Sequence, residues 1–114
     1  MRTFRQIRLK ERDQKAIEAA SKLLRERFPV ETVILFGSKA RGEDNSESDI
    51  DLLALTTRHL SWEERDAITD GLFDIELNQD VGISTFVASV TEWEEGVYSV
   101  LPMHEEVSQD GVVA

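Results

Sequence analysis

Residues 33–55, VILFGSKARGEDNSESDIDLLAL, form the stretch that decides the fold of this chain. It opens with an apolar run of strand formers at positions 33–36 and closes with a second run at positions 50–55, which one aspartate interrupts. Such runs are typical of strands that are buried on both faces. A Gly-Ser pair follows the first run, and an Asp-Ile-Asp triplet begins the second. The pattern predicts two buried strands that bracket a polar loop, with the reactive groups at the two ends of the loop.

Composition limits the class of protein to which the chain can belong. With 114 residues, 40% of them hydrophobic and 32% charged, we expect a single soluble globular domain over residues 1–114. The longest apolar run is too short to span a membrane, and the charged segment 1–15 lacks the apolar core of a secretory signal. We therefore expect a cytoplasmic protein without a membrane partner. The absence of cysteine excludes disulfides and thiolate chemistry.

Charge is unevenly distributed along the chain. Residues 1–28 carry nine Lys/Arg and four Asp/Glu, a net charge of +5, whereas the remaining 86 residues carry four and nineteen, a net charge of −15. An acidic body repels the phosphate backbone of nucleic acids, so direct nucleic-acid binding is not expected. A basic partner protein fits the body better, and the basic leading segment fits a solvated helix face.

Periodicity on either side of the opening stretch predicts two long helices. Apolar residues recur every three or four positions over residues 11–28, and Pro29 then ends this amphipathic helix. Ser61 and Glu64 match a capping box that begins a second helix, which we expect to end near Asn78. The apolar side of this second helix is expected to comprise Trp62, Ile68, Leu72, Phe73 and Leu77.

The remaining predicted elements are shorter. Residues 81–88 alternate as a third strand, and two short helices follow, one beginning at Thr91 and one over residues 102–111. Residues 43–48 contain no apolar side chain and predict a solvated connection. One sheet with helices packed against it is the simplest arrangement of elements in this order.

Gly37 and Ser38 can form a phosphate-binding corner. A glycine directly after a strand allows the backbone to approach a ligand, and the N–H groups that open the following helix point toward it. The Ser38 hydroxyl can add a hydrogen bond to a phosphate oxygen. A tight turn with a helix cap is the alternative interpretation of this pair.

Asp49 and Asp51 favour the phosphate-binding interpretation. They lie two residues apart at the start of a strand, so their side chains project from the same face and their carboxylates lie close together. Adjacent carboxylates repel unless they are solvated, share a proton or bind a cation, and hard oxygen ligands favour Mg²⁺. The ten residues between Ser38 and Asp49 suffice for a short helix and a loop that would bring both loop ends to one crevice. Metal and phosphate would then meet there, as phosphoryl or nucleotidyl transfer requires.

These residues resemble the signature of a known family. The motif of the DNA polymerase β-type nucleotidyltransferases is similar to the pattern found here, in which ten residues separate Gly37-Ser38 from Asp49-Ile50-Asp51. The compact members of that superfamily are the minimal nucleotidyltransferases, which are often the antitoxin partners of HEPN-type toxins. The resemblance covers nearly the whole chain. It implies the nucleotidyltransferase fold, an α+β structure with a small mixed sheet of three or more strands flanked by helices.

The resemblance also implies a reaction. Gly37, Ser38 and Arg41 would contact the phosphates of ATP or another nucleoside triphosphate, and Asp49 and Asp51 would bind two Mg²⁺ ions. The usual reaction of the family transfers a nucleoside monophosphate to a hydroxyl and releases pyrophosphate, and in the antitoxins the acceptor can be a tyrosine of the toxin. Arg41 could instead pair with an acidic neighbour. The oligomeric state, including a homo-oligomer, stays open.

The third metal-binding carboxylate of the family lies on the third strand, where this sequence leaves two alternatives. Asp80 stands at the entrance of that strand and, by alternation, on the same face as Gly82 and Ser84. Counting back from Trp93 places Ser84 where many relatives carry their aspartate. Asp80 would then act as the third catalytic and metal-binding carboxylate, displaced ~3 to 7 Å along the strand, or it is a plain loop residue.

Two functions fit these features. The first is a Mg²⁺-dependent enzyme of the protein adenylyltransferase type, which modifies a HEPN-type toxin and acts as its antitoxin. The second is a catalytically weakened binding module that neutralises the toxin by occupying it. Transfer to a small molecule is a third alternative, for which 114 residues leave little room. His59 and His104 are expected to be surface or packing residues, and Trp62 and Trp93 are expected to pack their helices onto the sheet.

Overall fold

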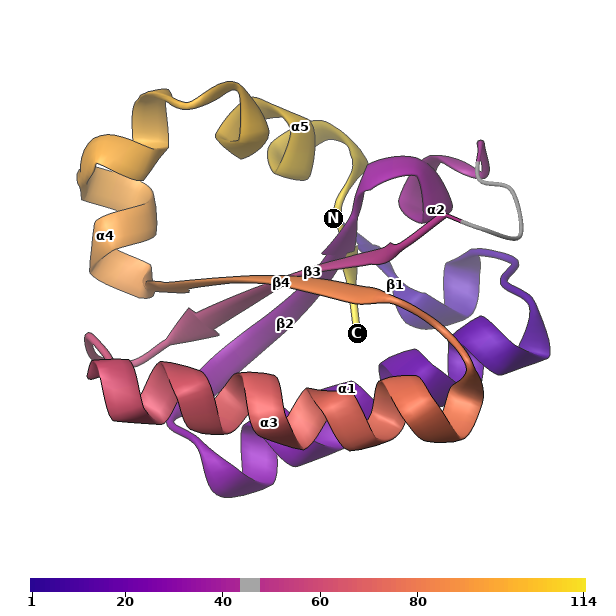
Figure 1. Cartoon of the computed structure of the whole chain (residues 1–114). Helices are drawn as coiled ribbons and strands as arrows, with labels where there is room; N and C mark the ends of the chain where they lie inside the picture. Colours follow the sequence, from indigo (N-terminus) through magenta and orange to yellow (C-terminus); the bar gives the residue numbers. More distant parts are fainter. Residues whose placement is uncertain (44–47) are drawn as a thin grey trace.

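A mixed five-stranded sheet forms the centre of the molecule (Figure 1). The computed structural model describes residues 1–43 and 48–114, so most of the predicted connection over residues 43–48 lies outside the described residues. The strands are β1 (Arg2–Thr3), β2 (Val30–Phe36), β3 (Ile50–Thr56), β4 (Ile83–Ser89) and β5 (Val112–Val113). They lie in the order β1-β5-β2-β3-β4, so β4 is an edge strand. The fold class expected from the sequence is confirmed.

The strand register places three strand ends at one end of the sheet. β2 and β3 pair antiparallel, which sets Phe36 at the end of β2 beside Asp51 near the start of β3. β4 pairs parallel with β3, and its Ser84 is the register partner of Asp51. Parallel neighbours need a crossover connection, and α3 (Trp62–Gln79) supplies it. The two ends of the opening stretch therefore meet beside the start of β4.

Helices cover both faces of the sheet (Figure 1). α1 (Glu11–Arg27) and α3 pack against one face, and α4 (Val90–Glu95) and α5 (Pro102–Asp110) lie over the other. α2 (Gly37–Arg41) follows β2 directly, and two 3-10 turns, η1 (Phe4–Gln6) and η2 (Val97–Val100), complete the described elements. Among residues 1–43 and 48–114, no helix is both long enough and apolar enough to cross a membrane.

The boundaries of the two long helices agree with the sequence prediction. Phe28 has extended backbone at the C-cap of α1, as expected for the residue before Pro29. The predicted capping box of α3 is present, because the Glu64 N–H donates to the Ser61 hydroxyl at 3.2 Å and the Ser61 N–H donates to the Glu64 carboxylate at 3.0 Å. β1 and β5 were not predicted, because a strand of two residues is too short to show an alternation pattern.

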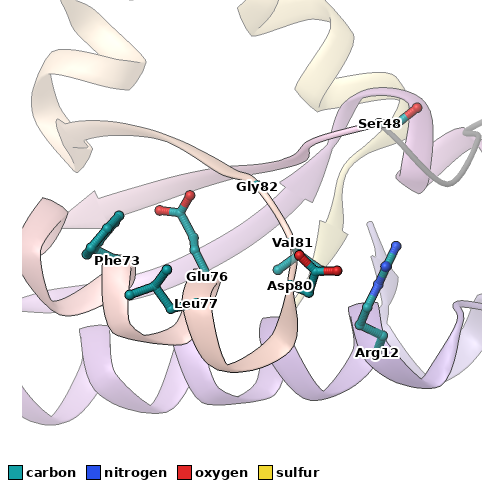
Figure 2. A pocket seen from close by; sticks show the side chains of 8 residues that line it. All are labelled: Arg12, Ser48, Phe73, Glu76, Leu77, Asp80, Val81 and Gly82. Atoms are coloured by element: carbon teal, nitrogen blue, oxygen red, sulfur yellow. The ribbon is translucent and has the colours of Figure 1, made fainter.

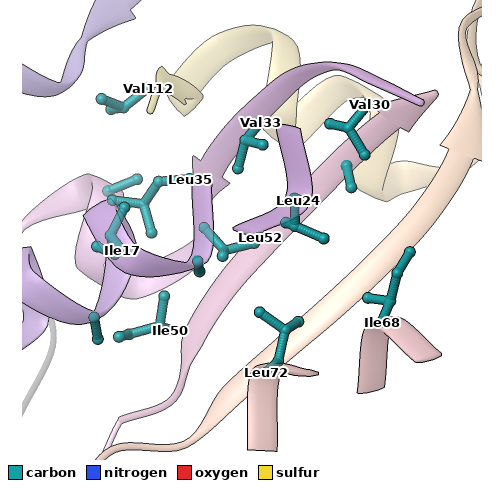
Figure 3. Close-up of a cluster of buried hydrophobic side chains, with 14 of the residues drawn as sticks. Ile17, Leu24, Val30, Val33, Leu35, Ile50, Leu52, Ile68, Leu72 and Val112 are labelled. Carbon is teal, nitrogen blue, oxygen red and sulfur yellow. The ribbon is translucent and has the colours of Figure 1, made fainter. Parts of the chain in front are cut away.

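The larger hydrophobic core lies between the sheet and the α1/α3 layer (Figure 3). Ile17 and Leu24 of α1, Val33 of β2 and Leu52 of β3 are fully buried there. Each such aliphatic side chain contributes about 1.5–3 kcal/mol when it is removed from water. A smaller cluster on the opposite face includes Trp93. These two clusters fix the sheet on which the candidate site is built.

Three of the four predictions for histidine and tryptophan residues are confirmed. Trp93 is buried and stacks against His104 with a ring-centroid distance of 4.6 Å. His104 is therefore a packing residue. His59 lies at the surface, where its Nδ1 is 3.3 Å from a carboxylate oxygen of Glu92.

The prediction for the outer face of α3 is wrong. Trp62, Phe73 and Leu77 are 81%, 55% and 64% exposed, and none of them packs the helix onto the sheet. At 3.6 residues per turn, these three positions fall within an arc of about 60°, and the buried Ile68 and Leu72 lie about 80–180° away from them around the helix. The apolar positions of α3 thus occupy two faces, of which only one can contact the core.

Candidate active site

Asp51 lies against the glycine that ends β2. Gly37 has φ of +77°, and a Cβ atom at this position would lie 2.3 Å from Oδ2 of Asp51. Glycine is therefore required at position 37 for two reasons. The backbone is left-handed, and the carboxylate fills the space that a side chain would need. Ser38, the next residue, is half-buried in the first turn of α2. The corner between β2 and α2 thus faces a carboxylate directly.

Asp49 makes an equivalent contact with the start of β4. A Cβ atom at Gly82 would lie 2.3 Å from Oδ1 of Asp49. The Ile50 N–H donates to the Gly82 carbonyl at 2.8 Å, which holds the two backbones together at this point. The two predicted aspartates are therefore brought together at one end of the sheet, each beside a glycine that flanks a neighbouring strand.

The electrostatic environment of Asp51 indicates two interacting carboxylates. Burial raises the pKa of Asp51, and the nearby charge of Asp49 raises it further. Glu106 of α5 adds to this effect, whereas Arg41 and Lys39 oppose it. A half-buried carboxylate beside another carboxylate favours a bound cation, which would return its pKa to a low value.

We expect Gly82→Ala to weaken the predicted Mg²⁺ binding with little loss of stability. The added methyl group would displace the Asp49 carboxylate, while the backbone of Gly82 does not require a positive φ. Mg²⁺ affinity, measured by isothermal titration calorimetry, should fall at least about tenfold.

A matched glycine provides the control for this prediction. Gly42 has φ of +72° and open space around its Cα, so Gly42→Ala should destabilise the fold by about 1–2 kcal/mol and leave Mg²⁺ affinity unchanged. Thermal unfolding of both variants checks the stability difference. Unchanged Mg²⁺ affinity of Gly82→Ala would contradict a role of Asp49 as a ligand.

Lys39 anchors the phosphate corner to α1. Its Nζ lies 2.9 Å from Oδ2 of Asp13, and both side chains are 1% exposed. Sequence reasoning missed this pair, because the two residues are 26 positions apart and their contact depends on how α1 packs beside α2. A buried lysine–aspartate pair resists separation, so α2 is held in a defined position.

Arg41 pairs with two glutamates. Its Nε lies 3.0 Å from Oε2 of Glu43, and its Nη1 lies 2.7 Å from Oε1 of Glu106. The hydrogen bonds that Arg41 donates to Glu43 and then to Glu106 raise the pKa of Arg41. The structure shows the acidic pairing that was one of the two alternatives for this residue, with partners in the following loop and on α5. Its contact with phosphate stays a prediction.

Asp80 lies apart from the aspartate pair. It is the C-cap of α3 with left-handed backbone, φ of 53° and ψ of 51°, and it precedes the start of β4 at Ile83. The prediction that Asp80 shares a face with Ser84 assumed that side chains alternate without interruption from residue 80 to residue 84. The left-handed turn at Asp80 interrupts this alternation. Among the described residues, no three His, Cys, Asp or Glu side chains lie close enough to hold one metal ion. Asp80 as a third ligand therefore stays a prediction, and Ser84 is the register partner of Asp51.

A cavity of about 360 Å³ is lined by Gly82, the glycine that lies against Asp49 (Figure 2). Asp80 and Gly82 line one side of it, and Arg12 of α1 contributes a positively charged side chain. Phe73 and Leu77, the exposed apolar residues of α3, line it as well. Sequence reasoning did not find this cavity, because its walls come from α1, α3 and the segments before β3 and β4.

A glycine corner beside a pair of carboxylates at the end of a mixed sheet is the site expected of the nucleotidyltransferase class. Residues 18–95, more than half of the chain, match the family model described as Polymerase beta, Nucleotidyltransferase. The chain belongs to this family. The resemblance found in the sequence is thereby confirmed.

One curated relative shares a short segment with this chain. Over 32 residues, the chain is 50% identical to a candidate protein adenylyltransferase of Methanocaldococcus jannaschii, MJ1379. The match covers 28% of this chain and spans only 32% of the length of that relative. It supports the nucleotidyltransferase assignment of the segment.

Three solved structures share the fold. A chain of a toxin–antitoxin assembly with AMP-PNP superposes with a TM-score of 0.60 at 20% identity, over 84% of this chain and 69% of that chain. A chain of the mutant toxin–antitoxin MntA-HpeT superposes with a TM-score of 0.58 at 22% identity, over 94% of this chain and 72% of that chain. A candidate nucleotidyltransferase from Sulfolobus solfataricus superposes with a TM-score of 0.53 at 19% identity, over 93% of this chain and 87% of that chain. At these identities the likeness shows the nucleotidyltransferase fold.

Proposed function

We propose that this chain is a Mg²⁺-dependent nucleotidyltransferase that transfers AMP from ATP to a hydroxyl of a partner protein, and that it acts as the antitoxin of a HEPN-type toxin. The observation that carries the proposal is the contact between the Gly37 corner and the Asp51 carboxylate. The adenylyltransferase name of the M. jannaschii relative supports the reaction. The toxin–antitoxin assemblies among the solved structures, one of them with AMP-PNP, support the nucleotide and the partner.

The carboxylates at this corner fit Mg²⁺ in type. Asp49 and Asp51 provide only oxygen ligands, and each carboxylate is placed by a glycine that leaves room for it. These two residues would hold the ions, which would supply positive charge beside the triphosphate and the acceptor oxygen. Asp80 stays the predicted third carboxylate of the set, although the register partner of Asp51 is Ser84.

The residues of the chain would bind and orient the nucleotide. The backbone of Gly37 and the hydroxyl of Ser38 would hold the terminal phosphates, and the pair of Lys39 with Asp13 keeps the corner in place. The acceptor oxygen forms a bond to the α-phosphorus, the bond from that phosphorus to the bridging oxygen breaks, and pyrophosphate leaves. The hydroxyl proton passes to water or to a carboxylate of the site.

The position of the label in ATP tests the proposed reaction. The protein is incubated with Mg²⁺ and the partner encoded beside it, with ATP labelled at either the α- or the γ-phosphate. We expect label on the partner only from α-labelled ATP, because pyrophosphate carries the γ-phosphate away. A stable complex without any transferred label would contradict the enzyme and favour the alternative of a binding module.

The alternative function rests on one observation. Ser84 is the register partner of Asp51, and the resemblance to the family implies a third carboxylate at this position. A site with two carboxylates binds Mg²⁺ less tightly than one with three, because affinity rises with the number of charged ligands. In that case the chain would neutralise its toxin by forming a complex.

Ser84→Asp distinguishes the two candidates for the third ligand. We expect it to raise Mg²⁺ affinity and the rate of AMP transfer by about tenfold or more, because a third carboxylate joins the site. Ser84→Asn serves as the control, because asparagine has the shape of the introduced aspartate without its charge. If Ser84→Asp has no effect while Asp80→Asn abolishes transfer, Asp80 is the third ligand and the assignment of Ser84 is wrong.

A further inference from the structure

The outer edge of β4 is available for pairing except at the Val87 carbonyl, which accepts from Arg65. β4 is the last strand of the sheet, so no strand of the described residues pairs with this edge. The Gly82 carbonyl accepts from Ile50 of β3, and backbone groups alternate in direction along a strand, so those of Ile83, Thr85 and Val87 point outward. Nη1 of Arg65 lies 3.2 Å from the Val87 carbonyl, which agrees with this direction.

α3 runs alongside β4 (Figure 1). Three cavities lie along these two elements, and we call the surface that contains them the α3–β4 groove. One of about 350 Å³ adjoins Trp62, one of about 220 Å³ contains Thr85 between α3 and β4, and the one of about 360 Å³ adjoins Phe73. The Thr85 hydroxyl is buried without a hydrogen-bond partner among the described residues. The groove therefore offers apolar contacts beside the outward backbone groups of β4.

The charge of α3 selects the kind of partner. α3 carries six Asp/Glu and one Arg, a net charge of −5. A second copy of the chain would place the same negative charge on both sides of the contact, which is unfavourable. A positively charged segment is complementary to this surface.

One end of the groove reaches the aspartate pair. Gly82 lines the cavity at this end and contacts Asp49. Ser84 is exposed, small and opposite Asp51, so it leaves open space above β4. A strand added to the edge of β4 would lie two strand spacings, about 10 Å, from β3, with alternate side chains directed over Ser84.

We propose that the α3–β4 groove binds an extended, basic segment of the partner protein. The segment pairs with the outer edge of β4, places its Lys/Arg side chains against the acidic α3, and carries the acceptor hydroxyl over Ser84 toward Asp51. The inference rests on the proposed function for its acceptor step, whereas binding to the groove is independent of catalysis. Main-chain pairing supplies affinity, and the alternate side chains supply specificity.

A defined basic polymer tests the binding step. The probe is a fluorescent random copolymer of lysine and tyrosine, its control is a copolymer of glutamate and tyrosine, and fluorescence anisotropy is measured without nucleotide. We expect the chain to bind the first and not the second. Asp66→Lys combined with Asp70→Lys should weaken binding at least about tenfold, because both residues lie beside the exposed apolar face of α3.

Two further variants distinguish binding in the α3–β4 groove from non-specific attraction between the basic copolymer and the acidic chain. Glu18→Lys combined with Glu26→Lys makes the same charge change on the exposed side of α1 and should leave most of the affinity. Thr85→Pro removes one outward N–H without touching the pairing of β4 with β3, and it should weaken binding by a similar factor to the α3 variant. Circular dichroism checks that each variant is folded.

The possible results overturn different statements. Equal loss of affinity for the basic copolymer in the α1 and α3 variants would contradict binding in the α3–β4 groove. So would sedimentation of the wild type as a dimer that Thr85→Pro dissociates, because the occupant would then be a second copy. Groove-dependent binding without AMP transfer to the copolymer or to the partner protein would leave the groove in place and contradict the proposed function alone.

Discussion

Asp51→Asn is expected to abolish nucleotidyl transfer and, at neutral pH, to raise the melting temperature. The substitution removes a ligand carboxylate at the Gly37 corner, so transfer should fall by about 10²–10³ or more. The same carboxylate is unfavourable for folding, because burial and the charge of Asp49 raise its pKa above 3.8. An opposite response of activity and stability is the signature of a functional group.

The pH dependence of this effect has a defined sign. A raised pKa means that the folded state disfavours the charged carboxylate, so the penalty is fully present above the folded pKa of Asp51. It decreases as the pH falls through that value and disappears below the unfolded pKa of 3.8. Melting temperatures of wild type and Asp51→Asn should therefore differ at pH 7 and converge near pH 3, apart from the small effect of the amide itself.

An exposed aspartate of α3 provides the control. Asp74→Asn removes one negative charge far from the Gly37 corner and should change neither transfer nor, by more than about 0.5 kcal/mol, stability. Full activity of Asp51→Asn would remove the basis of the proposed function. Equal destabilisation by Asp51→Asn at pH 3 and pH 7 would contradict the unfavourable environment of Asp51.

Asp13→Ala is expected to destabilise the fold by about 3–5 kcal/mol, because it leaves the buried ammonium of Lys39 without this carboxylate. The two groups are 2.9 Å apart and 1% exposed. Lys39→Met should cost a comparable amount, because it leaves the Asp13 carboxylate buried. Chemical denaturation followed by circular dichroism measures both.

The double variant Asp13→Leu with Lys39→Met provides the decisive comparison. Replacing both partners of a buried ion pair by apolar side chains is often neutral or stabilising, so the double variant should be more stable than either single variant. Its transfer activity should still be reduced if the pair positions α2. Strictly additive losses would show that the two side chains do not interact.

Much of the fold could be predicted because its signals are local. Pro29 ends α1, and Ser61 with Glu64 begins α3, since each acts on backbone groups only a few positions away. The apolar runs around residues 33–36 and 50–55 likewise carry their own strand propensity. The Gly-Ser pair and the Asp-Ile-Asp triplet could be recognised because the chemistry of phosphate and metal binding requires those residue types at those positions.

The sequence by itself thus determined the two central strands, the long helices and the residues of the corner. Only the tertiary structure decided that Ser84 rather than Asp80 lies opposite Asp51, because strand register depends on contacts across the sheet. It also decided which apolar face of α3 is buried, since both faces have helical spacing and one core can accept only one of them. The pairing of Lys39 with Asp13 was decided in the same way, by the packing of helices that are distant in the chain.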